Sequence, residues 1–131
     1  MWQSIDDEIF WGEQQSGMRR KGTVKFNKDL YWGDSIKHRT LVKWRLFHGK
    51  RQPAIYCIMR AMAKSDQLDI MNSQLLQQPY YEDNPAYIYG IASGHEEALK
   101  LVVRMTEDAS RAGFDGRILD FLNSGIAGSN A

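Results

Sequence analysis

The chain has 131 residues, of which 43% are hydrophobic and 25% charged, and its 17 Lys and Arg against 16 Asp and Glu leave a net charge of +1 at pH 7. This composition is that of an ordinary folded domain and argues against a disordered chain. A single cysteine, Cys57, excludes an internal disulfide, and no apolar stretch is long enough to cross a bilayer, so we expect a cytoplasmic protein without a membrane partner.

The N-terminal third predicts a helix followed by two strand-like pieces. Ser4 precedes the acidic residues 6–8, a pattern typical of a helix start. Residues 23–26 and 30–32 are rich in β-branched and aromatic side chains, and Asn-Lys-Asp at 27–29 between them favours a turn. The sequence therefore predicts a β-hairpin here.

Residues 35–48 fit two patterns. Apolar side chains at 42, 44 and 46 alternate with cations, as in a half-buried strand. Asp34 or Ser35 as an N-cap and Gly49 as a terminator indicate a helix instead. The side chains that would then share one side of the helix are Ile36, Thr40, Trp44 and Phe47. We favour the helix.

The middle of the chain predicts two strands and a short helix. Residues 54–62 are apolar on both faces for most of their length, which indicates a central strand with Cys57 buried in it. Residues 68–71 form a shorter strand after a polar turn. Asn72 or Ser73 then caps a helix that Pro79 ends.

The C-terminal half holds the clearest helix. Residues 86–92 predict a strand, in which alternation puts Tyr87, Tyr89 and Ile91 on one face. Ser93 and Glu96 then have the spacing of a capping box, and Gly113 is suited to the position after the last turn, so we expect a helix over about 94–112. A short helix at 117–122 follows, closed by Gly125.

This order of elements predicts an α+β (mixed α/β) fold, a small mixed sheet of three to five strands with helices packed on it. We expect one globular domain over residues 1–124, with 1–21 as a peripheral helical arm and 125–131 as a flexible tail.

The charge is distributed unevenly. Residues 18–52 hold eleven Lys and Arg against Asp29 and Asp34, a local charge of +9, so the other 96 residues carry −8. Such clustering predicts either a polyanionic partner or a matching acidic surface. Aromatic side chains interleaved with the cations favour nucleic acid, because they stack on unpaired bases.

We therefore predict a non-catalytic binding protein that engages a nucleic acid or an acidic protein surface through residues 19–51. The residues expected to make that contact are Arg19, Arg20, Lys21, Lys25, Lys37, Arg39, Lys43, Trp44, Arg45, Lys50 and Arg51. Trp32 is a second candidate for stacking.

Two alternatives use the same segment. In the first, a homo-oligomer pairs the basic segment with its own acidic helices, which include residues 6–8 and the carboxylates at 96, 97, 107 and 108. In the second, His38 or His48 acts as acid–base catalyst of a metal-independent ribonuclease, with cations holding phosphate and Tyr31 in support.

Other segments carry weaker signals. Gly90 to His95 runs from a strand into a helix start, as an anion site requires, but it has neither dinucleotide nor P-loop spacing. The histidines lack metal-ligand spacing and have no second cysteine beside them, so we expect no metal and no cofactor. Tyr80, Tyr81 and Tyr87 fit either a binding groove or a loop pinned to the sheet.

Overall fold

The computed structural model describes residues 24–61 and 67–125, which form a four-stranded mixed sheet with helices packed on it. The elements in chain order are β1 (Val24–Trp32), α1 (Arg39–Phe47), β2 (Ile55–Arg60), β3 (Leu68–Asn72), the 3-10 helix η2 (Ser73–Gln77), α2 (Tyr80–Asp83), β4 (Ala86–Ser93), α3 (His95–Arg111) and α4 (Ile118–Asn123). The α+β fold and the long helix predicted from the sequence are confirmed. The predicted helix at Ser4 and the tail from 126 lie outside the described residues.

The strands lie in the order β1-β4-β2-β3. β4 runs parallel to β1 and antiparallel to β2, and β2 is antiparallel to β3. The inner position of β2 agrees with its two apolar faces, and Cys57 is fully buried in it. The burial of the thiol raises its pKa to about 12.

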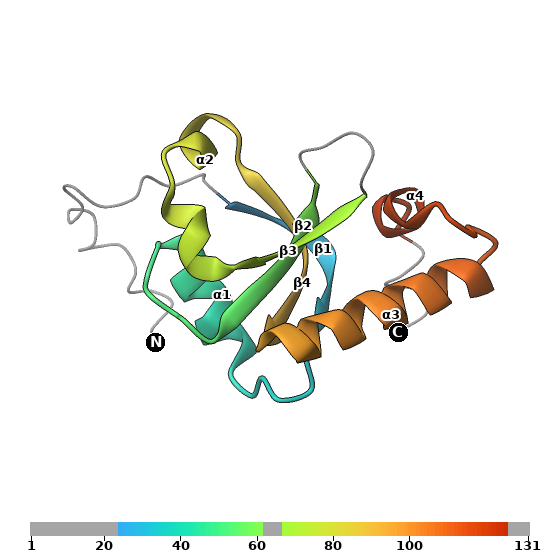
Figure 1. The fold of residues 1–131 in the computed structure, drawn as a ribbon, viewed down its shortest axis with the longest axis horizontal. Coiled ribbons are helices and arrows are strands. Elements are labelled where there is room, and N and C mark those ends of the chain that lie inside the picture. Colours follow the sequence, from blue (N-terminus) through green and yellow to red (C-terminus); the bar gives the residue numbers. More distant parts are fainter. Residues whose placement is uncertain (1–23, 62–66, 126–131) are drawn as a thin grey trace.

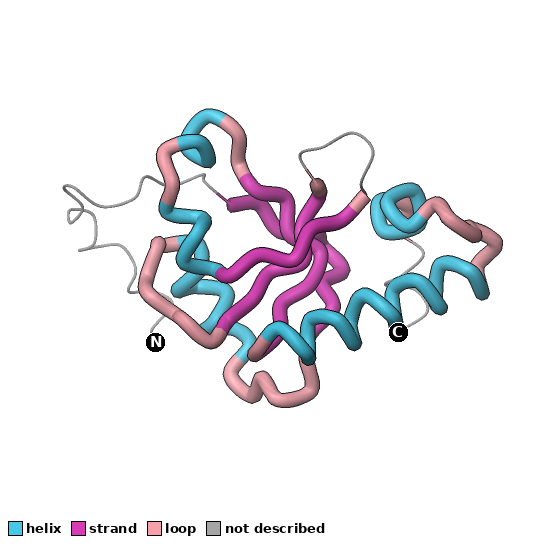
Figure 2. The backbone as a smooth tube through the Cα atoms, viewed as in Figure 1, coloured by secondary structure: helices cyan, strands magenta, loops and turns pink. Residues whose placement is uncertain are grey.

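Helices cover both faces of the sheet. Figure 1 shows α3 and α4 on one side and α1 and α2 on the other, and Figure 2 shows the strands crossing between them. The first core, under α1, η2 and α2, contains Leu46, Cys57 and Ile88, and the second, under α3 and α4, contains Tyr89, Met105 and Phe121. No helix in the described ranges is long and apolar enough to cross a bilayer.

The predicted hairpin at 27–29 is wrong. Residues 24–26 pair with 86–88 and residues 31 and 32 with 90 and 91, so both strand-like pieces lie on the same partner, β4, in one irregular strand. Asn27 is buried between them, where its side-chain nitrogen donates to the carbonyl of Leu122 (3.4 Å) and its oxygen accepts from the hydroxyl of Tyr87 (3.2 Å). These partners, which are distant in the sequence, keep residues 27–29 from forming a turn, and the strand forms a bulge there instead.

A second irregularity shifts the faces of β4. Ile58 pairs with Gly90, but the next residue, Met59, pairs with Ile88, so Tyr89 is an extra residue in the ladder. Tyr87 and Tyr89 therefore belong to the core under α3, and Ile91 belongs to the opposite core, contrary to the predicted alternation.

Residues 39–47 are helical, as favoured from the sequence, and Gly49 ends the helix with φ 70°. The start is later than predicted, because His38 is the N-cap and no side chain caps the first turn. Leu46 is the buried residue of α1 and Val42 packs beside it, whereas Thr40, predicted to lie on the inner side, is exposed.

Glu97, and not Glu96, caps the start of α3. Its carboxylate accepts the backbone N–H of Ser93 (2.7 Å), the backbone N–H of Ser35 (3.0 Å) and the hydroxyl of Ser35 (2.9 Å). Partial desolvation raises the pKa of this carboxyl group, but these hydrogen bonds more than offset it, so the pKa lies below its usual value. One side chain thus joins the junction of β4 and α3 to the loop that follows β1.

Gly33 makes room for this contact. It is buried, and its N–H donates to the carbonyl of Ile91 (2.8 Å). A Cβ atom at this position would collide with the carboxylate of Glu97. Glycine is therefore needed here for space and not for a left-handed backbone.

The end of α3 is a Schellman motif, as Gly113 predicts. The N–H of Phe114 donates to the carbonyl of Ala109 (2.7 Å), the N–H of Gly113 donates to that of Ser110 (3.0 Å), and Gly113 has φ 89°. Phe114 packs in the core beneath the helix, which turns the chain back toward α4.

We predict that Gly33→Ala and Glu97→Ala each lower the free energy of unfolding by about 1–2 kcal/mol, the usual size for loss of a charged cap. Because both substitutions remove the same contact, the double variant should be little worse than either single one. Urea unfolding of all four proteins measures this coupling. Additive losses would show that Gly33 acts independently of Glu97, and Glu96→Ala, at an exposed neighbouring position, is the matched control.

The lowered pKa of Glu97 also predicts a pH dependence. A carboxyl group whose pKa is lower in the folded than in the unfolded state stabilises the fold above its unfolded pKa, and this contribution is lost as pH falls through the folded pKa. The difference in unfolding free energy between the wild type and Glu97→Gln should thus be constant above about pH 5.5 and shrink below about pH 4.5. A difference independent of pH from 3 to 7 would contradict this role of the charge.

Candidate polyanion-binding surface

Eight of the eleven cations between 18 and 52 lie in the described residues, and all eight are exposed. They are Lys25 and Lys28 on β1, Lys37 before α1, Arg39, Lys43 and Arg45 on α1, and Lys50 and Arg51 after it. Arg19, Arg20 and Lys21 lie outside the described residues. We call these eight residues the basic surface.

None of the basic surface forms an ion pair with a described carboxylate. Residues 36–51 contain six Lys and Arg and no Asp or Glu. The ion pairs of the described chain lie elsewhere, between Arg104 and Asp34, Arg111 and Asp108, and Arg117 and Asp120. The basic surface is thus an unmatched positive region over the described part of the chain.

The carboxylates of α3 do not meet the cations of α1 in the same chain. The two helices cover opposite faces of the sheet (Figure 1). Asp108 accepts hydrogen bonds from Arg111 and from Tyr31, and Glu97 is held by Ser35 and Ser93. Within one subunit, Asp108 and Glu97 therefore do not pair with the cations of the basic segment in the described structure.

Two cations of α1 lie over aromatic rings of β1. The guanidinium of Arg39 is 5.5 Å from the ring centre of Trp32, and the ammonium of Lys43 is 5.1 Å from that of Phe26. Arg39 and Lys43 are one helical turn apart, so both point to the flank of α1 that faces β1. Cation–π contacts of this kind keep the charged group at the surface while its ring partner is partly buried.

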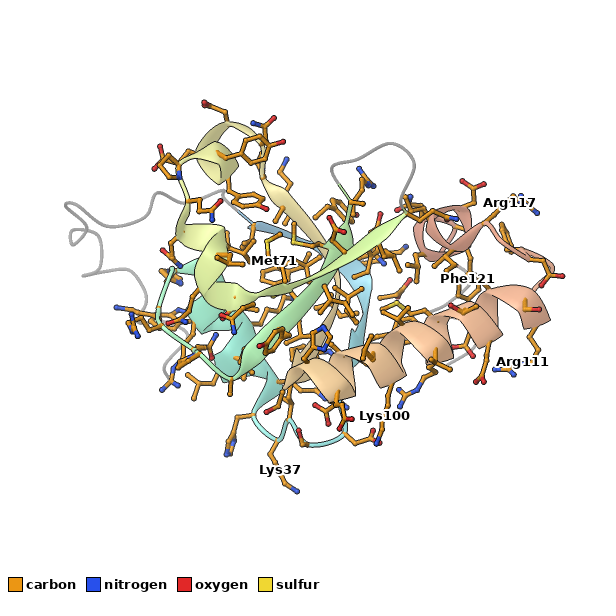
Figure 3. All side chains as sticks on the ribbon, in the orientation of Figure 1. Lys37, Met71, Lys100, Arg111, Arg117 and Phe121 are labelled. Carbon is orange, nitrogen blue, oxygen red and sulfur yellow. The ribbon has the colours of Figure 1, made fainter. Side chains whose placement is uncertain are left out.

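The remaining cations point in other directions. Arg45 is two residues from Lys43, about 200° around the helix axis, and so lies on the opposite flank of α1. Lys37 precedes the helix and projects outward at the bottom of the view in Figure 3. The cations of α1 and of the residue before it therefore spread around the helix, and Lys25 lies on β1 between Val24 and Phe26, which face the core under α1, so the basic surface does not form a single stripe.

Trp44 is the predicted stacking residue, and it is partly buried. Its ring stacks on that of His48 at 4.3 Å between centres and an angle of 28°. The Nδ1–H of His48 donates to the carbonyl of Trp44 (2.9 Å), which fixes the imidazole against the helix end. The second candidate, Trp32, is also partly buried and lies under Arg39.

The structure does not bring the predicted ribonuclease residues together. The hydroxyl of Tyr31 donates to Asp108 (2.7 Å) on the α3 side of the sheet, and burial, with this hydrogen bond, raises its pKa. His38 and His48 flank the two ends of α1, so the helical rise separates their backbones by about 15 Å. Tyr31 and α1 lie on opposite faces of the sheet.

Two other segments that the sequence singled out, residues 90–95 and the tyrosine loop around Tyr81, contact other parts of the protein. At the start of α3 the carboxylate of Glu97 takes the place that an external anion would need, and His95 packs edge-on against Tyr56. Tyr81 is buried with its hydroxyl 3.3 Å from the sulfur of Met71, which agrees with a loop pinned to the sheet.

Within the described ranges, no group of three His, Cys, Asp or Glu is placed to hold a metal ion.

The sequence did not predict that the rings of Trp32 and Phe26 lie under Arg39 and Lys43. Trp32 and Phe26 were visible as aromatic residues, but their positions under cations of α1 depend on how the helix packs on β1. The i, i+4 spacing of Arg39 and Lys43 was the available signal, because it places both on one side of a helix.

Comparison of the chain with protein-family models, with curated proteins and with solved structures found no match.

We predict that Lys37→Gln, Lys50→Gln and Arg51→Gln leave the free energy of unfolding unchanged or raise it by up to about 0.5 kcal/mol, because each removes repulsion and breaks no ion pair. Thermal or urea unfolding at low salt measures the effect. A fall of more than about 1 kcal/mol in the free energy of unfolding of any variant would reveal a stabilising partner for that cation. Arg104→Gln, which breaks the exposed pair with Asp34, is the comparison.

Proposed function

We propose that the protein is a non-catalytic binding protein that engages a polyanion, a nucleic acid or an acidic protein surface, through its basic surface. The observation that carries the proposal is the unmatched charge of residues 36–51, which hold six cations and no carboxylate. Exposed cations without partners create a local positive field, and this field attracts extended anions even when the net charge of the whole chain is near zero.

The spread of the cations favours an extended anion over a small one. A single phosphate needs two or three donors that converge on one point. Here Arg39 and Lys43 lie on one flank of α1 and Arg45 on the other, while Lys50 and Arg51 follow the helix. A backbone with many phosphates can contact such separated cations in succession, and each contact releases counterions.

The helix dipole of α1 adds to the positive field of these cations. Its first turn contains no acidic residue and no capping side chain, and Arg39 occupies its first position. The N-terminal end of a helix carries a partial positive charge, which acidic residues normally offset. At α1 that partial charge is left to reinforce Lys37 and Arg39.

The second candidate function is a homo-oligomer in which the basic surface meets acidic side chains of another subunit. Its support is the acidic balance of the rest of the chain. The carboxylates of Glu97 and Asp108 are already engaged within the subunit, which weakens that matching.

Binding to fluorescent single-stranded and double-stranded DNA, RNA and poly-glutamate at several salt concentrations tests the proposal. We expect the logarithm of affinity for nucleic acid to fall linearly with the logarithm of salt concentration. Lys50→Gln/Arg51→Gln should weaken binding and reduce the slope by about 1–2, if each residue contacts one phosphate. Binding of poly-glutamate alone would select the acidic-protein alternative.

The matched control is Arg104→Gln/Arg117→Gln, which removes the same charge from α3 and from the residue before α4. Equal weakening by both double variants would indicate attraction by net charge and would contradict a binding surface at residues 19–51. Failure of every polyanion to bind at low salt would overturn the proposed function.

A further inference from the structure

The segment that precedes β1 in the chain has a charge opposite to that of α1. Residues 1–16 contain four carboxylates, at positions 6, 7, 8 and 13, and no Lys or Arg. Residues 36–51 contain six Lys and Arg and no Asp or Glu. Each segment therefore carries a single sign of charge, and the two signs are complementary.

The described carboxylates do not match the basic surface. Eleven of the 16 Asp and Glu lie in the described ranges, and none of these eleven forms an ion pair with a cation of the basic surface. The other five are the four of residues 1–16 and Asp66, which has Lys64 two positions before it. Residues 1–16 thus hold most of the negative charge to which the described structure assigns no partner.

The described chain begins beside the C-terminal end of α1. Arg39, the first residue of α1, lies over Trp32 at the end of β1, and Lys43, one turn later, lies over Phe26 near the start of β1. The helix therefore runs in the direction opposite to the strand. Its C-terminal end is level with Val24, which is buried in the core under α1.

The connection from this point is long enough for residues 1–16 to reach all of α1. The seven residues 17–23 span up to about 23 Å when extended. The nine residues of α1 rise by only about 13 Å. The four carboxylates can therefore approach the cations at either end of the helix, including its N-terminal end, where no acidic side chain offsets the partial positive charge.

α1 also exposes an apolar side chain among its cations. Leu41 is 37% exposed, and Arg45 follows it by one turn on the same flank of the helix. The acidic segment combines the same two kinds of chemistry, because Ile5 and Ile9 stand on either side of the acidic residues 6–8. An apolar contact with Leu41 and ion pairs with its neighbours can thus form together.

We propose that residues 1–16 dock on α1 of the same chain and compete with the polyanion for the basic surface. Exposed ion pairs are individually weak, so docking needs several of them at once, is readily reversed, and survives the loss of any one lysine. The competition rests on the proposed function, whereas the docking itself does not.

The covalent connection gives the segment an advantage over free anions. A short linker holds a tethered segment at an effective concentration of the order of millimolar, so even weak docking occupies the surface for much of the time. A short acidic peptide or a single phosphate is then excluded, because it offers no more charge than the segment does. A long nucleic acid contacts more cations and releases more counterions, so it displaces the segment. The device selects long polyanions over short ones.

Carbodiimide crosslinking of the full chain tests the docking without a polyanion, because the reagent joins a carboxylate and an ammonium group in contact as an amide. At about 5 μM protein and low salt, we expect amides from residues 6–8 or 13 to Lys37, Lys43 or Lys50, located by mass spectrometry in the species of 15.1 kDa. Saturating single-stranded DNA should reduce their yield several-fold, and so should 0.5 M salt, because it screens the pairs.

Neutralisation of the segment tests the competition. The triple variant Asp6→Asn/Asp7→Asn/Glu8→Gln should raise the affinity for single-stranded DNA at least fivefold at low salt, because the surface is then unoccupied. The matched control is Glu96→Gln/Glu107→Gln/Asp115→Asn, which removes the same charge from exposed positions on and after α3. The control should raise the affinity no more than about twofold, through net charge alone.

The outcomes separate this proposal from the proposed function. Amides to Lys37, Lys43 or Lys50 in a chain that binds no polyanion would support the docking and overturn the proposed function. Amides to Lys21 or Lys100 alone would overturn the docking, and crosslinked species of twice the chain mass alone would replace it with contact between two copies. An equal gain in affinity from both triple variants would overturn the competition.

Discussion

The carboxylate of Glu97 is the contact on which the arrangement of the molecule depends. It receives hydrogen bonds from Ser93, at the end of β4, and from Ser35, in the loop after β1. β1 and β4 are parallel neighbours, so their carboxyl ends lie at the same end of the sheet. A charged acceptor at that point satisfies the start of α3 and fixes the loop that leads into α1, which sets where the cations of α1 begin.

The sheet separates two chemically different faces. On one face α1 carries cations over aromatic rings, with no carboxylate nearby in sequence. On the other, α3 carries both signs of charge, and two of its cations form ion pairs, Arg111 with Asp108 and Arg104 with Asp34 in the loop after β1. The separation explains why a chain with net charge of +1 has a strongly positive side.

The parts of the fold that were predictable have causes close by in the sequence. Gly113 and Gly49 end α3 and α1 because glycine adopts positive φ at low cost, and both do so here. Asn72 caps η2 through its own side chain, which accepts from the N–H of Gln74. The apolar run around Cys57 gave an inner strand because both of its faces must be covered.

The sequence by itself determined the types of most elements, their ends and the concentration of charge, because periodicity, capping and composition act over a few residues. Only the tertiary structure decided that Asn27 anchors a bulge, that Glu97 caps α3 in place of Glu96, and that Arg39 and Lys43 lie over rings of β1. The partners of Asn27 and Glu97 are up to 95 and 62 residues away in the chain. Contacts at such separations form only once the order of the strands is set, and they then override the local conformational preferences of the residues involved.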